Sequence, residues 1–203
     1  MKHQAKQKTV FFYCTILMLL VLPGIHAEET DSRYLGISLG SMFDQIDDKK
    51  SADHFYRPVS LNFDNTFGFQ IRGGYVMNNY ISAEAMLEYV FPFETDSSTE
   101  KVEIDVIHLA LQSKIRYPQQ GPIQPYGLIG LGIMNTQMNA EISFDGSNIQ
   151  ETEWGFSTKI GAGVDIYITH NIFSNLELSW TKGMGNVDHV QYPAFIVGGN
   201  YQF

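Results

Sequence analysis

The chain has 203 residues, and 22 acidic against 13 basic side chains give it a formal net charge of −9 at pH 7. This balance argues against nucleic acid as a partner, because phosphate backbones are bound mainly by Lys and Arg. Aromatic residues are frequent at 13%, and the 18 Gly residues outnumber the basic residues. That composition is typical of a β-barrel with apolar side chains toward lipid and small side chains toward a crowded interior.

Residues 1–27 have the order of charged, apolar and small residues that is found in a secretory signal peptide. Three lysines precede an apolar run at 10–22, and the small residue Ala27 follows. The run is shorter than the ~20 residues that a membrane-spanning helix needs, so a retained anchor is the less favoured alternative. We expect cleavage after Ala27, which leaves a single domain at 28–203.

The mature chain is expected to contain no thiol. The only cysteine, Cys14, lies in the expected signal peptide, so the mature chain would have no disulfide and no Cys-based metal site. Loss of Lys2, Lys6 and Lys8 leaves 10 basic against 22 acidic residues, a net charge near −12.

Apolar and polar residues then alternate in eight segments of about ten residues or more. This period of two predicts strands with one apolar and one polar face, and the length suits tilted strands that cross a membrane. The expected strands are 33–43, 65–75, 80–91, 103–117, 126–143, 152–168, 172–182 and 193–203. The alternation is clearest in 152–168. The glycine-rich core of 126–143 gives no clear faces, and this strand is expected to extend beyond the membrane.

The connections between these strands alternate between long and short. Long polar stretches are expected at 44–64, at 92–102, around a hairpin tip at 145–148 and at 183–191, and tight turns at 77–79, 119–125 and 169–171. Outer-membrane barrels have this asymmetry, with short turns in the periplasm and long loops outside. We therefore predict an all-β fold, an eight-stranded antiparallel up-and-down transmembrane barrel with both chain ends in the periplasm.

Aromatic residues gather at the two ends of the expected strands. One set lies near the turns: Tyr75, Tyr80, Tyr117, Tyr126, Tyr167, Tyr201 and Phe203. The other set lies near the long connections: Phe43, Phe67, Tyr89, Phe91, Trp154, Trp180 and Phe195. Two such girdles are typical of the two membrane interfaces. A soluble lipocalin-like barrel, whose apolar face would line a cavity, is the alternative, but it requires neither girdle.

Three motifs make the chain resemble the OmpA/OmpX-type outer-membrane β-barrel family, in its porin-like or opacity-like form. They are Pro125-Tyr126-Gly127 with the GLGIM run that follows, Gly161–Asp165 and Gly198–Phe203. The resemblance covers residues 33–203. It implies a monomer in the outer membrane of a Gram-negative bacterium, in contact with lipid and lipopolysaccharide, and it is nearly silent on activity. Because the sequence stops at Phe203, we do not expect the wall-anchoring role of longer family members.

The last expected strand, 193–203, carries alternating aromatic residues and ends in Phe203. It resembles the closing strand of bacterial outer-membrane barrels, which the barrel-assembly machinery reads. Gly198, Tyr201 and Phe203 are therefore expected to form a C-terminal assembly signal.

The inward faces of the expected strands collect charges of both signs. The positions are Arg72, Glu84, Glu88, Lys114, Arg116, Lys159, Asp165 and Glu177. Unpaired charges in a narrow interior would be costly, so we expect an ion-pair network. Side chains just fill the interior of an eight-stranded barrel, which favours a structural plug. A gate or a narrow polar pore is the functional alternative.

The long connections are acidic. The carboxylates in or beside them are Asp44, Asp47, Asp48, Asp53, Asp64, Glu94, Asp96, Glu100, Glu141, Asp145, Glu151, Glu153 and Asp188. One interpretation is a solvated rim, and the other is a surface that binds divalent cations or a basic host or envelope protein. Carboxylates suit Ca²⁺ and Mg²⁺, but no fixed-spacing calcium loop is present, so no metal ligand and no cofactor is assigned.

No catalytic residue is assigned. A hydrolase needs a nucleophile, a base and an orienting acid within hydrogen-bond reach, and no His-x-Ser pair places base and nucleophile side by side on one strand. His54 and His189 follow Asp53 and Asp188, which allows an omptin-like Asp-His arrangement at a barrel mouth, although such neighbours are common by chance. We expect a protein that is not an enzyme.

Two functions are consistent with these patterns. The first is a structural and surface-interaction role, in envelope integrity or adhesion through the acidic loops. The alternative is a narrow porin-like channel for small solutes. A route for apolar solutes, as in OmpW-type barrels, needs an apolar interior, and the inward charges argue against it.

Overall fold

The computed structural model describes residues 32–43, 65–97, 100–117, 121–142 and 147–203. The expected signal peptide and the connection at 44–64 lie outside the described residues. Residues 32–203 form one compact unit. None of the helices in the described ranges combines the length and the hydropathy needed to cross a membrane.

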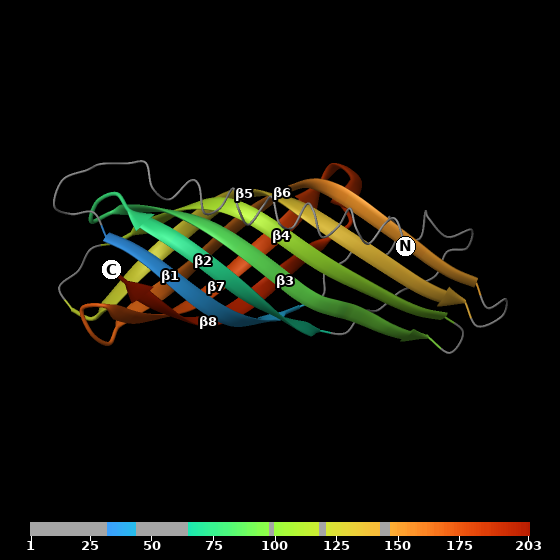
Figure 1. The fold of residues 1–203 in the computed structure, drawn as a ribbon, viewed down its shortest axis with the longest axis horizontal. Helices are drawn as coiled ribbons and strands as arrows, with labels where there is room; N and C mark the ends of the chain where they lie inside the picture. The colour runs from blue at the N-terminus through green and yellow to red at the C-terminus, as the bar shows by residue number, and fades with distance from the viewer. Residues whose placement is uncertain (1–31, 44–64, 98–99, 118–120, 143–146) are drawn as a thin grey trace. The chain divides into compact units, whose positions relative to one another are not determined.

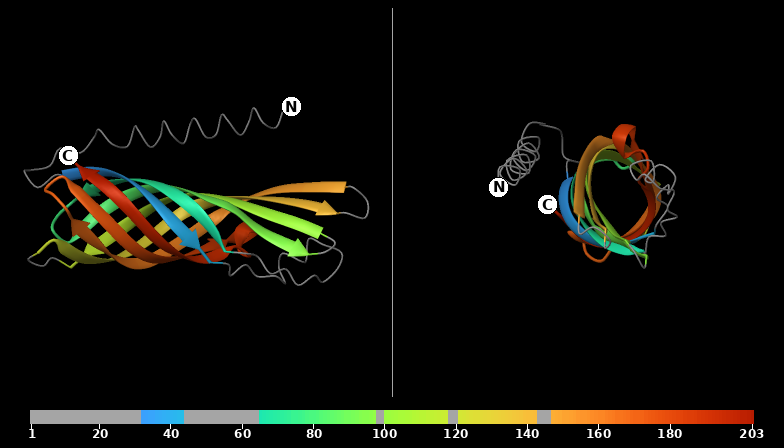
Figure 2. Two further views of the ribbon diagram at one scale, coloured as in Figure 1. Left: turned by 90° about the horizontal axis from the view of Figure 1, so that it is seen from below. Right: turned by 90° about the vertical axis from the view of Figure 1, so that its right-hand side faces the viewer.

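Eight antiparallel strands close into a barrel in which each strand pairs with the next and β1 pairs with β8 (Figure 1). Seen from one end, the strands form a closed ring (Figure 2, right). Their bounds are β1 Ser32–Met42, β2 Thr66–Val76, β3 Ile81–Ser97, β4 Glu100–Arg116, β5 Ile123–Ile142, β6 Ser147–Tyr167, β7 Ile172–Met184 and β8 Gln191–Gln202. A short 3₁₀-helix, η1 (Gly185–Val187), lies between β7 and β8. The predicted eight-stranded fold is confirmed.

The alternation of side chains along β1 shows which face of the barrel is apolar. Leu35 is 56% exposed and Ile37 and Leu39 are 70% exposed on the outer surface, whereas Tyr34 and Ser38 are buried inside. An outer apolar surface of this kind is what a transmembrane barrel presents to lipid. The lipocalin-like alternative is wrong, because it would place these side chains in the interior.

Two of the tyrosines that were predicted for the turn-side girdle point inward instead. Tyr126 is only 4% exposed, and Tyr167 is half-buried and stacks on Phe173 with ring centroids 5.1 Å apart. Glycine makes room for the first ring, because a Cβ atom on Gly163 would lie 2.6 Å from Cζ of Tyr126. Sequence position near a turn therefore does not by itself identify a girdle residue, since inward and outward positions alternate.

The polar stretch at 92–102 is not a loop, as the sequence predicts, but continues β3 and β4. Only residues 98–99 separate the two strands. The register shifts between Val90 and Phe93, around Pro92, and Phe93 is fully buried inside the barrel. Proline cannot donate a ladder hydrogen bond and is found at bulges. The bulge also changes which face Phe93 occupies, which strict alternation from Phe91 would miss.

Strands β3 to β6 continue beyond the neighbouring strands β2 and β7, at the end of the barrel where the long connections are predicted (Figures 1 and 2). The β2–β3 ladder ends at Val90 and the β6–β7 ladder begins at Phe156. We call residues 93–97, 100–105, 137–142 and 147–153 of these strands the sheet extension. The expected length of the fifth strand is confirmed, and β6 extends with it; the position of this extension beyond the membrane stays a prediction.

Apolar side chains fill both ends of the interior. At the end with the long connections, the loop side, the buried cluster consists of Met42, Val90, Phe93, Ile104, Val106, Met134, Val187, Val190, Tyr192, Ala194 and Ile196. At the opposite end, the turn side, Tyr34, Val76 and Phe173 form a smaller buried cluster with Tyr167 against it. The interior therefore has an apolar cluster at each end, with charged and polar residues between and beside them.

Candidate functional site

The eight charged residues expected inside the barrel all lie there, on five different strands. β2 supplies Arg72, β3 Glu84 and Glu88, β4 Lys114 and Arg116, β6 Lys159 and Asp165, and β7 Glu177. None is more than 5% exposed. Inward-facing alternation on each strand is what brings these side chains, which are distant in sequence, into one narrow space.

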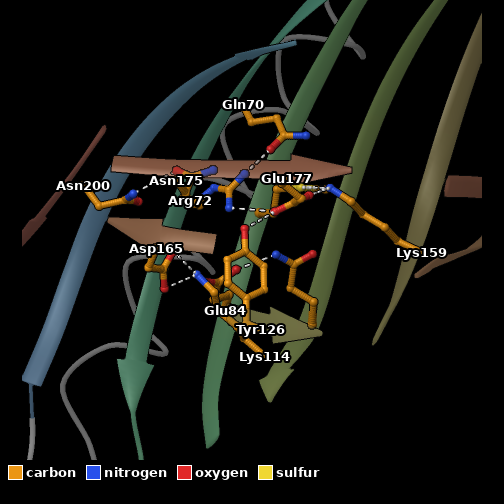
Figure 3. Close-up of polar contacts among 12 residues, drawn as sticks. Gln70, Arg72, Glu84, Lys114, Tyr126, Lys159, Asp165, Asn175, Glu177 and Asn200 are labelled. Atoms are coloured by element: carbon orange, nitrogen blue, oxygen red, sulfur yellow. Dashed lines mark hydrogen bonds and ion pairs between the residues drawn. The ribbon is translucent and has the colours of Figure 1, made fainter. Parts of the chain in front are cut away.

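Glu177 is the centre of one group of contacts (Figure 3). Its Oε2 lies 3.1 Å from Nη1 of Arg72, and its Oε1 lies 3.0 Å from Nζ of Lys159. The hydroxyl of Tyr126 donates a hydrogen bond to the same carboxylate, at 3.2 Å. A single buried carboxylate therefore joins two cations that come from strands on opposite sides of the barrel, β2 and β6.

Lys114 is the centre of a second group, nearer the turn side. Its Nζ lies 2.8 Å from Oδ2 of Asp165 and 3.6 Å from Oε1 of Glu84. Nε of Arg116 lies 3.7 Å from Oδ2 of Asp165, and the hydroxyl of Tyr34 donates a hydrogen bond to Glu84. Two cations and two carboxylates thus share one cluster, which balances the buried charge.

Neutral side chains connect these groups, and their roles are not evident from the sequence. Gln70 accepts a hydrogen bond from Nη2 of Arg72 at 2.6 Å and donates one to Glu88. Nζ of Lys114 lies 3.8 Å from the centre of the Tyr126 ring, so Tyr126 contacts both groups. Alternation does place Gln70 inside, but pairing across the barrel depends on the register of all eight strands.

Glu88 departs from the expected pattern of Lys and Arg partners. Within 4 Å, its titratable neighbour among the described residues is His108, whose Nδ1 lies 3.6 Å from Oε1 of Glu88. The carboxylate also accepts hydrogen bonds from Gln70 and from the hydroxyl of Tyr192. Glu88 therefore joins the polar interior to the apolar cluster on the loop side, to which Tyr192 belongs.

His108 also contacts Ser157, although the two residues lie far apart in the sequence. Oγ of Ser157 lies 2.8 Å from Nε2 of His108. The two residues come from β4 and β6, with Gly132 between them. The glycine makes the contact possible, because a Cβ atom at this position would lie within 3 Å of both Nε2 of His108 and Oγ of Ser157. Ser157, His108 and Glu88 contact one another in the sequence nucleophile, base and acid that a hydrolase uses. None of the three is more than 1% exposed, so none is in contact with solvent in this structure.

Of the two Asp-His pairs considered for a barrel-mouth enzyme, the structure describes only the second. His54 and Asp53 lie outside the described residues. His189 is 7% exposed, and its Nδ1 lies 4.0 Å from Oε2 of Glu153 on β6. The described residues contain no group of three or more His, Cys, Asp or Glu side chains that could hold a metal ion.

Several buried polar atoms have no hydrogen-bond partner among the described residues. They include Ser38 Oγ, Arg116 Nη2, Asn175 Nδ2, Ser179 Oγ and Asn200 Oδ1. Buried polar groups in native proteins are nearly always hydrogen-bonded, and ordered water is the usual partner where protein atoms are absent. We expect ordered water beside some of these atoms.

Comparisons with known proteins agree with the barrel. A family model described as "Outer membrane protein beta-barrel domain" matches residues 14–203. Outer membrane protein A of Escherichia fergusonii is 24% identical over 127 residues, which are 63% of this chain and 36% of the relative. The corresponding protein of Salmonella typhi is 22% identical over 146 residues, 69% of this chain and 41% of the relative. The chain thus spans less than half the length of these curated relatives.

Solved structures with the same fold have low sequence identity. Neisserial surface protein A superposes with a TM-score of 0.57 at 13% identity and covers 88% of this chain and 100% of its own. Ail, the attachment invasion locus protein of Yersinia pestis, superposes with a TM-score of 0.53 at 16% identity and covers 85% of this chain and 97% of its own. These likenesses concern the fold alone.

Proposed function

Because the chain belongs to the family of outer membrane protein β-barrel domains, it is a protein of the outer membrane, and we propose that it acts there as a structural and surface-interaction protein. Its partners on this proposal are lipid and lipopolysaccharide around the barrel and a basic host or envelope protein at the sheet extension. The barrel is a monomer, and the assembly machinery reads its closing strand through Gly198, Tyr201 and Phe203.

The filled interior is the observation that carries this proposal. Charged side chains pair across the middle of the barrel, and apolar clusters lie at both ends. An eight-stranded barrel has little space beyond that which side chains occupy. A protein with such an interior offers its surroundings mainly its outer wall and its loop side.

The charge of the sheet extension supports a basic partner. Its acidic residues are Glu94, Asp96, Glu100, Glu103, Asp105, Glu141, Glu151 and Glu153, and its basic residue is Lys101. Excess charge of one sign attracts partners of opposite sign and raises their rate of association at low ionic strength. These residues belong to strands β3 to β6 and not to an irregular loop.

The test is binding of a Lys-rich peptide to the barrel in lipid nanodiscs. We expect binding that weakens as salt rises, and loss of binding when Glu94, Asp96, Glu100, Glu141 and Glu151 are replaced by their amides. The matched control replaces Asp44, Asp47, Asp48, Asp53 and Asp64 by Asn, which removes the same number of charges outside the extension.

A polyanion provides the opposite probe. Ail has been crystallised with the heparin analogue sucrose octasulfate, and we expect the acidic extension of this chain not to bind that compound. Binding of the polyanion in place of the peptide, or equal loss of peptide binding in both amide variants, would exclude the extension as the interaction surface.

A narrow channel is the second candidate, and the partnerless polar atoms of the interior favour it. Water near Asn175 and Asn200 could form part of a path if the ion pairs rearranged. Conductance in planar bilayers separates this candidate from the first, because a surface-interaction protein needs no current.

A further inference from the structure

The connection between β7 and β8 is shorter and less exposed than the long polar loop predicted at 183–191. β7 continues to Met184, and η1 follows it directly. Val187 and Val190 are both 0% exposed and belong to the loop-side apolar cluster. We call residues 183–190 the stopper segment, because Val187 and Val190 pack inside the barrel mouth, whereas Met184 is exposed.

Two glycines form a close-fitting seat for Val187. A Cβ atom on Gly155 would lie 2.4 Å from Cγ2 of Val187, and a Cβ atom on Gly183 would lie 2.0 Å from the carbonyl oxygen of Val187. Any larger side chain at either position would displace the valine. The turn itself depends on Gly185, whose φ of +76° is a conformation that residues with a Cβ atom rarely adopt.

Backbone hydrogen bonds hold the stopper segment to itself and to the base of the turn. The N–H of Gly183 donates to the carbonyl of Val190 at 2.9 Å, and the N–H of Val190 donates to that of Val187 at 3.1 Å. The neighbouring Asn186 is exposed. One side of the segment therefore faces water and the other packs into the barrel.

Polar residues of the interior lie directly behind this apolar packing. Tyr192 belongs to the same cluster as Val187, and its hydroxyl donates to Glu88. Glu88 lies beside His108, which contacts Ser157. Val187 and Val190 of the stopper segment therefore lie in the apolar cluster that borders these buried polar groups on the loop side.

We propose that residues 183–190 form a movable stopper, and that Val187 must leave its seat between Gly155 and Gly183 before the polar interior is reachable from the loop side. The stopper is a local element, because a turn held by few backbone hydrogen bonds opens at lower free-energy cost than the strands around it. The ion pairs of the middle layer and the turn-side cluster remain in place when it opens.

Single cysteines test this proposal cleanly, because Cys14 is the only cysteine in the sequence and lies in the expected signal peptide. Ser157→Cys reports on the interior behind the stopper, and Ser82→Cys reports on the interior near the turn side. Each is combined with Val187→Asp, with Asn186→Asp as the matched control that adds the same charge at the exposed neighbour. The measured quantity is the rate at which a large charged thiol reagent labels the refolded barrel in lipid.

We expect labelling at position 157 to be slow in the parent and with Asn186→Asp, and at least about tenfold faster with Val187→Asp. Labelling at position 82 should stay slow in every variant. Gly155→Ala crowds Val187 and the carbonyl oxygen of Met184, 2.5 Å from the added Cβ, without adding a charge. It should also speed labelling at position 157, and it covers the case in which Val187→Asp does not fold. Circular dichroism and protease resistance verify the fold.

Three results would overturn the proposal. Fast labelling at position 157 in the parent would mean that the segment does not close the mouth. Equal labelling rates in the folded parent, Val187→Asp and Gly155→Ala proteins would mean that Val187 does not control access. Fast labelling at both reporter positions in the variants would indicate general unfolding of the barrel rather than a local stopper.

Discussion

Arg72 on β2 and Glu177 on β7 meet across the barrel interior, with Nη1 3.1 Å from Oε2, although their strands are not neighbours in the sheet. Lys159 on β6 reaches the same carboxylate at 3.0 Å. The contact joins opposite walls of the barrel, so its energy depends on closure of the sheet. Removing this contact therefore measures how strongly the interior network stabilises the fold.

The first prediction is that Glu177→Gln destabilises the barrel more than any single amide replacement on the loop side. Loss of this carboxylate leaves Arg72 and Lys159 buried without their shared partner, and breaking a buried ion pair costs about 3–5 kcal/mol. The measurement is the free energy of unfolding in urea with the protein in lipid vesicles.

Glu151→Gln is the matched control for this measurement, because Glu151 is exposed on the sheet extension. We expect its effect to stay within about 0.5 kcal/mol, as for most surface substitutions. Equal effects of the two substitutions would contradict a stabilising role for the Glu177 contacts.

The second prediction concerns conductance of the refolded barrel in a planar bilayer. We expect little or no current in the native protein, because paired side chains and two apolar clusters fill the interior. The double variant Arg72→Ala, Lys114→Ala removes a long cation from each group of contacts, and any opening should occur in this variant. Steady, salt-dependent current in the native protein would contradict the plug and favour the narrow channel.

Much of this fold follows from side-chain alternation, which depends on short-range patterns along each strand. Leu35, Ile37 and Leu39 lie outside as the period of two predicts, and Arg72 lies inside. Alternation cannot reveal which inward residues meet, because pairing of Arg72 with Glu177 requires the register around the whole barrel. The contact between His108 and Ser157 is hidden from sequence for the same reason.

Irregular backbone explains the other differences between prediction and structure. The bulge at Pro92 returns Phe93 to the interior and lets β3 continue through a stretch whose charges suggest a loop. The stopper segment contains Gly, Asn and Asp, which predict a loop, but Val187 packs inside. Local composition indicates where the chain turns, and it does not indicate whether the turn faces water.

The third prediction uses two adjacent glycines on β2. A Cβ atom on Gly74 would lie 2.1 Å from Cζ of Tyr34, whereas the nearest atom to a Cβ on Gly73 would be Cδ1 of Leu35, at 3.9 Å. Gly74→Ala should displace the Tyr34 ring and its hydrogen bond to Glu84, with a loss of about 1–3 kcal/mol in the free energy of unfolding. Gly73→Ala should have little effect.

Both alanine variants are measured by the same urea titration in lipid vesicles. The comparison isolates the Tyr34 contact, because the two substitutions add the same methyl group to neighbouring residues on one strand. If Gly73→Ala destabilised the barrel as much as Gly74→Ala, loss of glycine itself, rather than crowding of Tyr34, would be the cause.

The fourth prediction tests which surface faces lipid. Ile37 is 70% exposed on the outer wall of β1, and Ile37→Arg should cost up to about 2–4 kcal/mol if this position lies near the middle of the bilayer. The control is Thr152→Arg on the sheet extension, which is exposed and lies beyond the last β6–β7 pair. Its cost should be close to zero in the same vesicles, because an arginine there remains in water. If Thr152→Arg lowered the free energy of unfolding as much as Ile37→Arg, the sheet extension would lie in the bilayer. If Ile37→Arg had a negligible effect, the outer face of β1 would not contact lipid.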